Sequence, residues 1–192
     1  MKTTKYNIPL IIFAGGKSSR MGQDKALLPF GGYNSLSEFQ TLRLSKLFKK
    51  VYISAKENKF DFEANVIEDK YKDSSPLVGI VSIFETLKVD KVFILSVDAP
   101  FVTKEVIDTL MNANNRFDAV IAKSKSGLQP LCGVYKRSVL PIAQAHLKEG
   151  NHRLNNLLKK VETQFVPFKD DTPFLNLNHP HEYEEALKNL EK

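Results

Sequence analysis

A cluster of glycines and cationic side chains occupies residues 13–25, which read Phe-Ala-Gly-Gly-Lys-Ser-Ser-Arg-Met-Gly-Gln-Asp-Lys. Glycine lets backbone N–H groups approach phosphate oxygens without a side chain in the way. Lys17, Arg20 and Lys25 place three cations within nine positions. Arg20 can hold a phosphate through two parallel hydrogen bonds, whereas Lys25 is a point charge suited to a phosphorus centre that gains negative charge. The segment therefore predicts a turn that binds a triphosphate.

Two other glycine-rich motifs do not fit the spacing of this segment. A P-loop needs its second glycine five positions after the first, but Met21 stands five positions after Gly16. A dinucleotide-binding fingerprint needs a glycine at the position of Lys17. A plain turn with solvated lysines is the structural alternative, and the complete spaced set of glycines and cations argues against it.

A carboxylate follows the strongest strand pattern of the chain. Residues 92–97 are nearly all apolar, and Asp98-Ala99-Pro100 comes directly after them. Proline keeps Ala99 extended, so the Asp98 side chain is expected to project beyond the sheet. A lone carboxylate suits Mg²⁺, which takes few protein ligands and completes its shell with water and phosphate oxygens. The alternative is a turn aspartate that caps the following helix.

Strand and helix patterns alternate along the chain. The expected strands cover residues 8–14, 51–55, 65–67, 92–97, 119–122 and 131–135, and the expected helices begin near Ser35, Pro76, Thr103, Val139 and His181. Apolar strands that alternate with helices predict an α/β fold, a doubly wound and mostly parallel sheet with helices on both faces, in three αβα layers. Ligands of such sheets bind beyond the carboxyl ends of the strands, near the point where strand order reverses.

The composition fits one domain over residues 1–192, with 42% hydrophobic and 26% charged residues. The net charge of +6 favours anionic partners, but the basic residues form no arginine-rich tract, so a small polyanion fits better than nucleic acid. No apolar run is long enough to cross a bilayer. Cys132 is the single cysteine, which excludes an internal disulfide, and it is expected to pack as a small apolar residue. These features permit a cytoplasmic location.

The segment from Phe13 to Lys25 resembles the signature of the molybdenum cofactor guanylyltransferases (MobA), Leu-Ala-Gly-Gly-x-Ser-x-Arg-Met-Gly-x-Asp-Lys. The chain departs from it through Phe13 in place of leucine and through the extra Lys17. Related cytidylyltransferases carry Ala-Ala-Gly where this chain has Ala14-Gly15-Gly16, so the resemblance favours guanine over cytosine. It extends over most of the chain and is also dense around Asp98, because the family's metal-binding aspartate stands in the same Asp-x-Pro context.

Other family motifs are matched less closely. Asp69 stands where the family has an aspartate that contacts the ribose or the base, and Ser54 stands where the family has a nucleotide-contacting asparagine. Residues 74–79 resemble the family's Gly-Pro-Leu-x-Gly turn, with Ser75 in place of the first glycine. The Ser75 substitution affects the expected backbone geometry of this turn.

Residues 176–180, Asn-Leu-Asn-His-Pro, resemble the family's Asn-x-Asn-Thr-Pro motif, which surrounds the pterin acceptor and the metal. If this segment is a strand, Asn176 and Asn178 face the same ligand. His179 and His181 look like a metal pair, but no further ligand is spaced to complete a zinc site.

The resemblance implies a Rossmann-like nucleotidyltransferase that moves GMP from GTP to the terminal phosphate of molybdopterin and releases pyrophosphate, with Mg²⁺ as cofactor. A cytidylyl- or sugar-phosphate nucleotidyltransferase of the same fold is the alternative, and a non-catalytic nucleotide-binding module is another. The implied partners are these small molecules, with transient contact to molybdopterin-delivering proteins, and the implied state is a monomer bound to neither membrane nor nucleic acid. The implied residues are Lys25, Asp98 and Arg20 for catalysis; Phe13, Ala14, Gly15, Gly16, Lys25, Ser54, Asp69 and Asp98 for GTP; Gly22, Gly79, Asn176 and Asn178 for the acceptor; and Asp98 for the metal.

Overall fold

The computed structural model describes residues 5–15, 22–113 and 116–190 of the 192-residue chain. Its strands form one seven-stranded sheet in the order β3-β2-β1-β4-β6-β5-β7. The strands are β1 (Leu10–Phe13), β2 (Val51–Ala55), β3 (Val66–Glu68), β4 (Lys91–Ser96), β5 (Ala119–Ser124), β6 (Gly127–Lys136) and β7 (Thr163–Pro167). The helices are η1 (Lys25–Leu27), α1 (Leu36–Ser45), α2 (Pro76–Thr86), α3 (Lys104–Met111), η2 (Arg137–Val139), α4 (Leu140–Lys148), α5 (Leu154–Leu158), η3 (Thr172–Phe174) and α6 (Pro180–Leu190).

The sheet is mostly parallel, as predicted. Strand β6 is the exception, because it runs antiparallel to both of its neighbours, β4 and β5. Strand β1 pairs with β2 on one side and with β4 on the other, so strand order reverses between β1 and β4. Parallel strands end at the same edge of a sheet, and the reversal leaves a crevice between the connections that leave β1 and β4.

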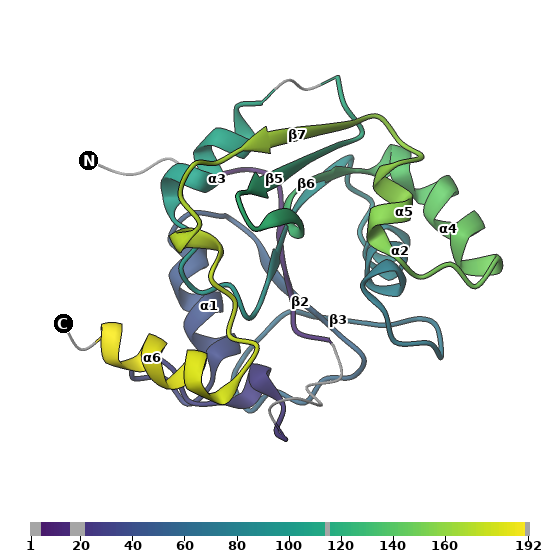
Figure 1. Cartoon of the computed structure of the whole chain (residues 1–192). Helices are drawn as coiled ribbons and strands as arrows, with labels where there is room; N and C mark the ends of the chain where they lie inside the picture. The colour runs from purple at the N-terminus through teal and green to yellow at the C-terminus, as the bar shows by residue number, and fades with distance from the viewer. Residues whose placement is uncertain (1–4, 16–21, 114–115, 191–192) are drawn as a thin grey trace.

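Helices cover both faces of the sheet and make the three-layer arrangement visible in Figure 1. Side chains from α1, α3 and α6 join the core on one face, and side chains from α2, α4 and α5 join the core on the other. Strand β1 contributes alternately to both, with Leu10 and Ile12 on the first face and Ile11 and Phe13 on the second. A continuous apolar strand is what a central parallel strand requires when both of its faces are covered.

Three helices begin where the sequence predicts them to begin. Ser35, Ser75 and Thr103 are N-caps, and each side chain accepts a hydrogen bond from the backbone N–H three residues further on. Such a bond satisfies one of the N–H groups that a helix start leaves without a partner. Pro76 occupies the first turn of α2, where its missing N–H costs nothing. Ser75 therefore has its own local function in this chain, the capping of α2.

The antiparallel hairpin of β5 and β6 is longer than the sequence predicts. Ala122 pairs with Gln129 while its neighbour Ile121 pairs with Gly133, so residues 130–132 bulge out of the β5 ladder. Pro130 lies in this bulge, where its lack of a backbone donor breaks no regular pairing. Strand β7 and the short helix α5 were not predicted.

Candidate functional site

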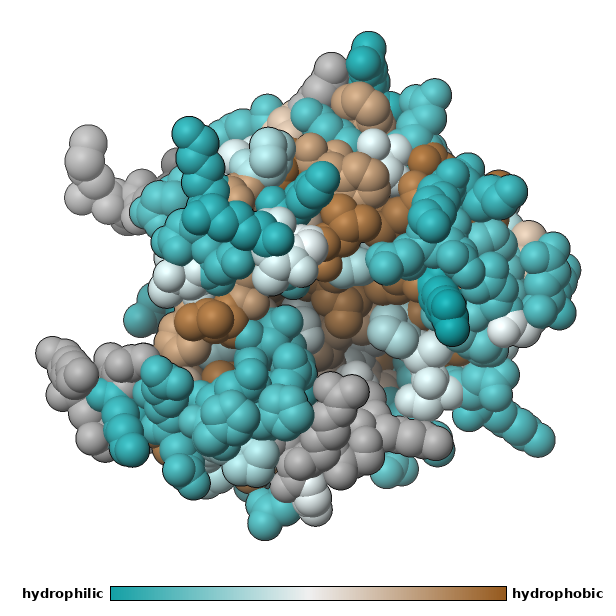
Figure 2. Space-filling model, viewed as in Figure 1, coloured by the Kyte–Doolittle hydropathy of each residue, from teal (hydrophilic) through white to brown (hydrophobic). Residues whose placement is uncertain are grey.

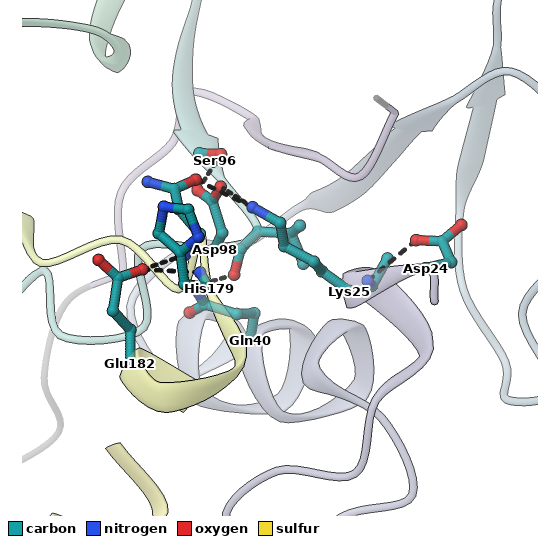
Figure 3. A network of polar contacts seen from close by, with 10 residues as sticks. Asp24, Lys25, Gln40, Ser96, Asp98, His179 and Glu182 are labelled. Atoms are coloured by element: carbon teal, nitrogen blue, oxygen red, sulfur yellow. Dashed lines mark hydrogen bonds and ion pairs between the residues drawn. The ribbon is translucent and has the colours of Figure 1, made fainter. Parts of the chain in front are cut away.

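Lys25 and Asp98 meet at the reversal point of the sheet. Lys25 is the first residue of η1, after β1, and Asp98 lies just beyond β4. The Lys25 ammonium donates a hydrogen bond to Asp98 Oδ2 at 3.3 Å, and the two side chains are only 16% and 19% exposed. Figure 3 shows Lys25 extending from η1 toward the carboxylate, with Ser96 beside it. Residues separated by 73 positions thus share one crevice.

The C-terminal asparagine segment completes this cluster. Lys25 donates a second hydrogen bond to Asn178 Oδ1 at 2.9 Å, and the Leu177 N–H donates to the Asp98 carbonyl at 2.9 Å. The strand interpretation of this segment is wrong, because residues 175–178 belong to no strand of the sheet. Backbone pairing with Asp98, rather than a strand register, brings the asparagines to the site.

Glu182 fixes the start of α6 beside this cluster. Its Oε2 accepts hydrogen bonds from the N–H groups of Asn178 and His179 at 2.7 and 2.8 Å. Both bonds are visible in Figure 3. A carboxylate at this end also complements the positive end of the helix dipole.

A buried polar network lies beneath Asp98. The fully buried Gln40 donates through Nε2 to the carbonyl of Val97 at 3.2 Å, and its Oε1 accepts from Arg43 Nη2 at 2.6 Å. Arg43 also donates to the carbonyl of Val102 at 2.7 Å. Burial lowers the pKa of Arg43 to about 10, which leaves the guanidinium charged at neutral pH. The network joins α1 to the turn that carries Asp98.

Ser96 is a further site residue that the sequence analysis missed. Its hydroxyl donates to Asp98 Oδ1 at 2.6 Å. The sequence does contain a signal for it, because Ser96 carries the one hydroxyl in the apolar run 92–97 and stands two positions before Asp98. In an extended chain, side chains two positions apart point to the same side. Gln40 has no comparable local signal, since its contact to Val97 spans 57 positions.

One cavity of about 290 Å³ opens beyond the carboxyl ends of β1, β2 and β3, and we call it the β1–β3 cavity. It is lined by Phe13, Gly15, Ser54, Ala55, Asp69, Ser74, Ser75, Pro76 and Gly79. Four of the residues matched to nucleotide contacts of the family, Phe13, Gly15, Ser54 and Asp69, therefore line one space, whereas Ala14, Lys25 and Asp98 do not line it. Ala14 continues β1 toward the site through a hydrogen bond from its N–H to the Ser54 carbonyl at 2.9 Å.

A second cavity of about 280 Å³ lies beside the ends of β4 and the bulge of β6, and we call it the β4–β6 cavity. Its lining consists of Ser96, Asp98, Ala99, Val102, Leu128, Gln129, Pro130, Leu131, Cys132, Phe174 and Asn176. The bulge of β6 supplies part of this wall, which agrees with the frequent use of bulges beside functional sites. Figure 2 shows apolar surface gathered in a central hollow that hydrophilic surface surrounds.

The remaining residues matched to the family fall in three places. Gly79 and Asn176, both matched to acceptor contacts, line different cavities: Gly79 the β1–β3 cavity and Asn176 the β4–β6 cavity. Gly22 has a φ of 67°, a left-handed conformation that favours glycine. Gly16 and Arg20 lie outside the described residues.

Gly79 packs so closely against β1 and β2 that any side chain there would collide with them. A Cβ on residue 79 would lie 2.6 Å from Phe13 Cε1 and 3.1 Å from Ser54 Oγ. We expect Gly79→Ala to lower the free energy of unfolding by about 1–3 kcal/mol, because overpacking outweighs the better helix propensity of alanine. Chemical denaturation of both proteins measures this change. A stabilised variant would show that α2 can move away from β1 at no cost.

Among the described residues, no group of three or more histidine, cysteine, aspartate or glutamate side chains is arranged to hold a metal ion. The rings of His179 and His181 stack with their centroids 5.5 Å apart.

Cys132 is buried, as predicted, and burial raises the pKa of its thiol to about 12. The thiol is therefore protonated at neutral pH and packs as an apolar group. No helix in the described part of the chain has the length and apolar character of a membrane span.

A mostly parallel sheet with a carboxylate and a cation facing each other at its strand reversal can bind a small anionic ligand at the strand ends. The fold is that of molybdopterin-guanine dinucleotide biosynthesis protein A from Archaeoglobus fulgidus, with a TM-score of 0.83, 21% identity and coverage of 96% of this chain and 99% of that one. A model of the MobA-like NTP transferase domain matches residues 10–165.

Two curated relatives carry the name molybdenum cofactor guanylyltransferase. The protein of Campylobacter jejuni subsp. doylei is 39% identical over 183 residues, which cover 94% of this chain and 95% of the relative. The protein of Helicobacter pylori strain G27 is 38% identical over 192 residues, which cover 97% and 94%. This chain belongs to the molybdenum cofactor guanylyltransferase family.

Proposed function

We propose that the protein transfers GMP from GTP to the terminal phosphate of molybdopterin and releases pyrophosphate, as a step of molybdenum cofactor biosynthesis. The names of its curated relatives support this activity. The observation that carries the proposal is the 3.3 Å contact between Lys25 and Asp98 at the strand reversal. Asp98 also lines the β4–β6 cavity, and the β1–β3 cavity of similar volume opens at the ends of the neighbouring strands. A transferase that joins two substrates needs two such spaces with the reacting groups at their border.

The β1–β3 cavity is the proposed nucleoside site. Its volume of about 290 Å³ is close to that of small-ligand pockets. The Phe13 ring and Gly79 offer an apolar surface for a base, and the Asp69 carboxylate can accept hydrogen bonds from ribose hydroxyls or from guanine N–H groups. The cation-bearing turn after β1 would then hold the triphosphate.

Asp69 carries an electrostatic cost that its proposed role explains. Desolvation raises the pKa of its carboxyl, and the nearby Lys56 partly opposes this shift. Because the pKa of Asp69 is higher in the folded state than in the unfolded state, its contribution to the free energy of unfolding is present at low pH. This contribution is lost as the pH rises through the folded-state pKa and the carboxyl ionises. We expect Asp69→Asn to raise the melting temperature at pH 7 and to flatten its decrease with pH. The same variant should bind GTP about tenfold more weakly, because it loses a charged acceptor. Unchanged GTP affinity in titration calorimetry would remove Asp69 from the nucleoside site.

The β4–β6 cavity is the proposed acceptor site. Leu128, Pro130 and Phe174 give it apolar walls, and the Gln129 and Asn176 amides add hydrogen-bonding groups. A flat heterocycle with polar edges, such as a pterin, needs this combination of apolar contact and a few directed polar groups. Asp98 lines the same cavity, which brings the acceptor next to the reacting phosphate.

The chemistry is an in-line displacement at the α-phosphorus of GTP. An oxygen of the acceptor phosphate forms the new bond to this phosphorus, and the bond to the oxygen bridging to the β-phosphate breaks. A phosphate is already anionic at neutral pH, so no general base is needed. Lys25 neutralises charge that develops on the α-phosphoryl oxygens, while Ser96 and Asn178 keep Asp98 and Lys25 in place.

Mg²⁺ fits the groups at Asp98. The carboxylate and the oxygens of Ser96 and Asn178 are hard donors, which Mg²⁺ prefers, and a single carboxylate is a usual protein contribution when phosphates supply other ligands. Bound there, Mg²⁺ would supply charge neutralisation for the triphosphate. Asp98 is the residue that would hold it.

The choice of nucleotide tests this proposal against a cytidylyl- or sugar-phosphate transferase of the same fold. Purified protein is incubated with Mg²⁺, molybdopterin and either GTP, CTP or UTP, and pyrophosphate release is followed. The proposal predicts a kcat/KM for GTP at least about tenfold above the others. A clear preference for CTP would contradict the guanine assignment and leave the transfer chemistry intact.

The proposal also includes a monomer that acts in the cytoplasm and receives molybdopterin by transient contact with a delivering protein. Light scattering at the concentration of the activity assay tests the monomeric state. A stable dimer, with activity that disappears on dilution, would contradict it.

A further inference from the structure

Lys59 contacts both sides of the glycine-rich segment, although it lies in the connection between β2 and β3. Its ammonium donates a hydrogen bond to the carbonyl of Ala14 at 3.2 Å and forms an ion pair with the carboxylate of Asp24. Ala14 directly follows β1, and Asp24 directly precedes Lys25. One nitrogen therefore holds together the two flanks of the proposed triphosphate turn.

Asp24 determines where the turn that carries Lys25 begins. It is the N-cap of η1, and its Oδ1 accepts a hydrogen bond from the Ala26 N–H at 3.0 Å. Its backbone carbonyl accepts a second bond from the Leu27 N–H at 3.0 Å. The other carboxylate oxygen, Oδ2, is the one paired with Lys59. Fixing Asp24 therefore fixes the direction in which Lys25 leaves the turn.

The connection that carries Lys59 is itself anchored. Phe60 and Phe62 pack against the core, and their rings form an edge contact with centroids 5.9 Å apart. The Asn58 N–H donates to Glu68 Oε1 at 3.0 Å, which ties the connection to β3. Lys59 can thus act as a fixed support for the turn from outside it.

We infer that Lys59 is a positioning residue for nucleotidyl transfer, which keeps the ends of the triphosphate turn together so that Lys25 faces Asp98. The inference rests on the proposed function, since the reaction is what the placement serves. An exposed lysine–aspartate pair contributes little to stability and is not expected to affect one substrate more than another. Lys59 differs from such a pair because it also binds a backbone carbonyl at the end of β1, and only 24% of its side chain is exposed.

The test compares three variants with the wild-type protein. Lys59→Met removes the ammonium, Lys59→Arg keeps a cation, and Lys104→Met removes the lysine of a matched ion pair, Lys104–Asp108, on α3. The affinity for GTP and for CTP is measured by titration calorimetry, and kcat and both KM values are measured for the transfer reaction.

Lys59→Met is expected to weaken GTP binding and to lower kcat, each by about tenfold, while the KM for molybdopterin stays within about twofold. Lys59→Arg should recover most of both losses, and Lys104→Met should match the wild type. Combining Lys59→Met with Asp24→Asn should add little to the larger single effect, because the two residues act together.

Unchanged GTP affinity and kcat in Lys59→Met would overturn the inference. An equal rise in both KM values together with a lower melting temperature would also overturn it, because that pattern indicates general destabilisation. If the wild type uses CTP instead of GTP, the guanine assignment fails, and the inference still holds when Lys59→Met weakens CTP binding by about the same factor. If the wild type binds neither triphosphate, both are overturned.

Discussion

Replacing Asp98 with asparagine is expected to lower kcat by about 10³-fold, because the variant loses the charged oxygen ligand at the proposed metal position while keeping its shape. The fold should survive the change, since the backbone bond between Leu177 and residue 98 does not involve the side chain. The amide introduced at position 98 can still accept a hydrogen bond from Ser96. Rapid-quench measurement of pyrophosphate release in a single turnover reports the effect on the chemical step.

A matched control separates catalysis from the loss of any carboxylate. Asp108 on α3 is also paired with a lysine, Lys104, and neither residue lines the two cavities. Asp108→Asn should keep kcat within about twofold of the wild type, as expected for an exposed ion pair. If Asp98→Asn kept the wild-type rate, Asp98 would have no part in the transfer.

Lys25→Met is expected to be the second most damaging change and to lower kcat by about 10²–10³-fold. Methionine keeps much of the length of the side chain but removes the charge that we propose faces the α-phosphoryl group. Asp98 would also lose its cationic neighbour at 3.3 Å, so part of the effect would act through the carboxylate. Steady-state kinetics with GTP and molybdopterin, together with GTP affinity from calorimetry, divide the loss between binding and chemistry.

Combining Lys25→Met with Asp98→Asn tests whether the two residues form one unit. When two residues act as a unit, the first substitution already removes most of what they contribute together. The loss of kcat in the double variant should therefore be far smaller than the product of the two single losses. Strictly multiplicative losses would show that Lys25 and Asp98 act independently, in disagreement with their shared site.

The sequence predicts the centre of the molecule well because local signals determine it. Strand β1 is apolar throughout, so its burial on both faces follows from composition alone. Ser35, Ser75 and Thr103 cap helices through bonds to residues only three positions away. Asp98 is a candidate from the sequence because a carboxylate that directly follows a buried apolar run differs from all of its neighbours in that run.

The edge of the sheet and the supports of the site were missed for physical reasons. Strand β7 is an edge strand with a partly exposed, mixed composition, and α5 has only five residues, too few to show a helical period. In β6, Pro130 interrupts a pattern that tertiary pairing still accommodates as a bulge. Lys59 and Gln40 act across 45 and 57 positions, and no local pattern encodes such contacts.

The position of the phosphate label tests most directly the claim that the α-phosphoryl group of GTP is transferred to the acceptor and that pyrophosphate leaves. The protein is incubated with Mg²⁺, molybdopterin and GTP labelled either at the α- or at the γ-phosphate, and the pterin product is isolated. Label from the α-position should enter the product in equal amount with released pyrophosphate, and label from the γ-position should leave with that pyrophosphate. Transfer of the γ-label to the pterin, or release of labelled phosphate to water alone, would contradict the account.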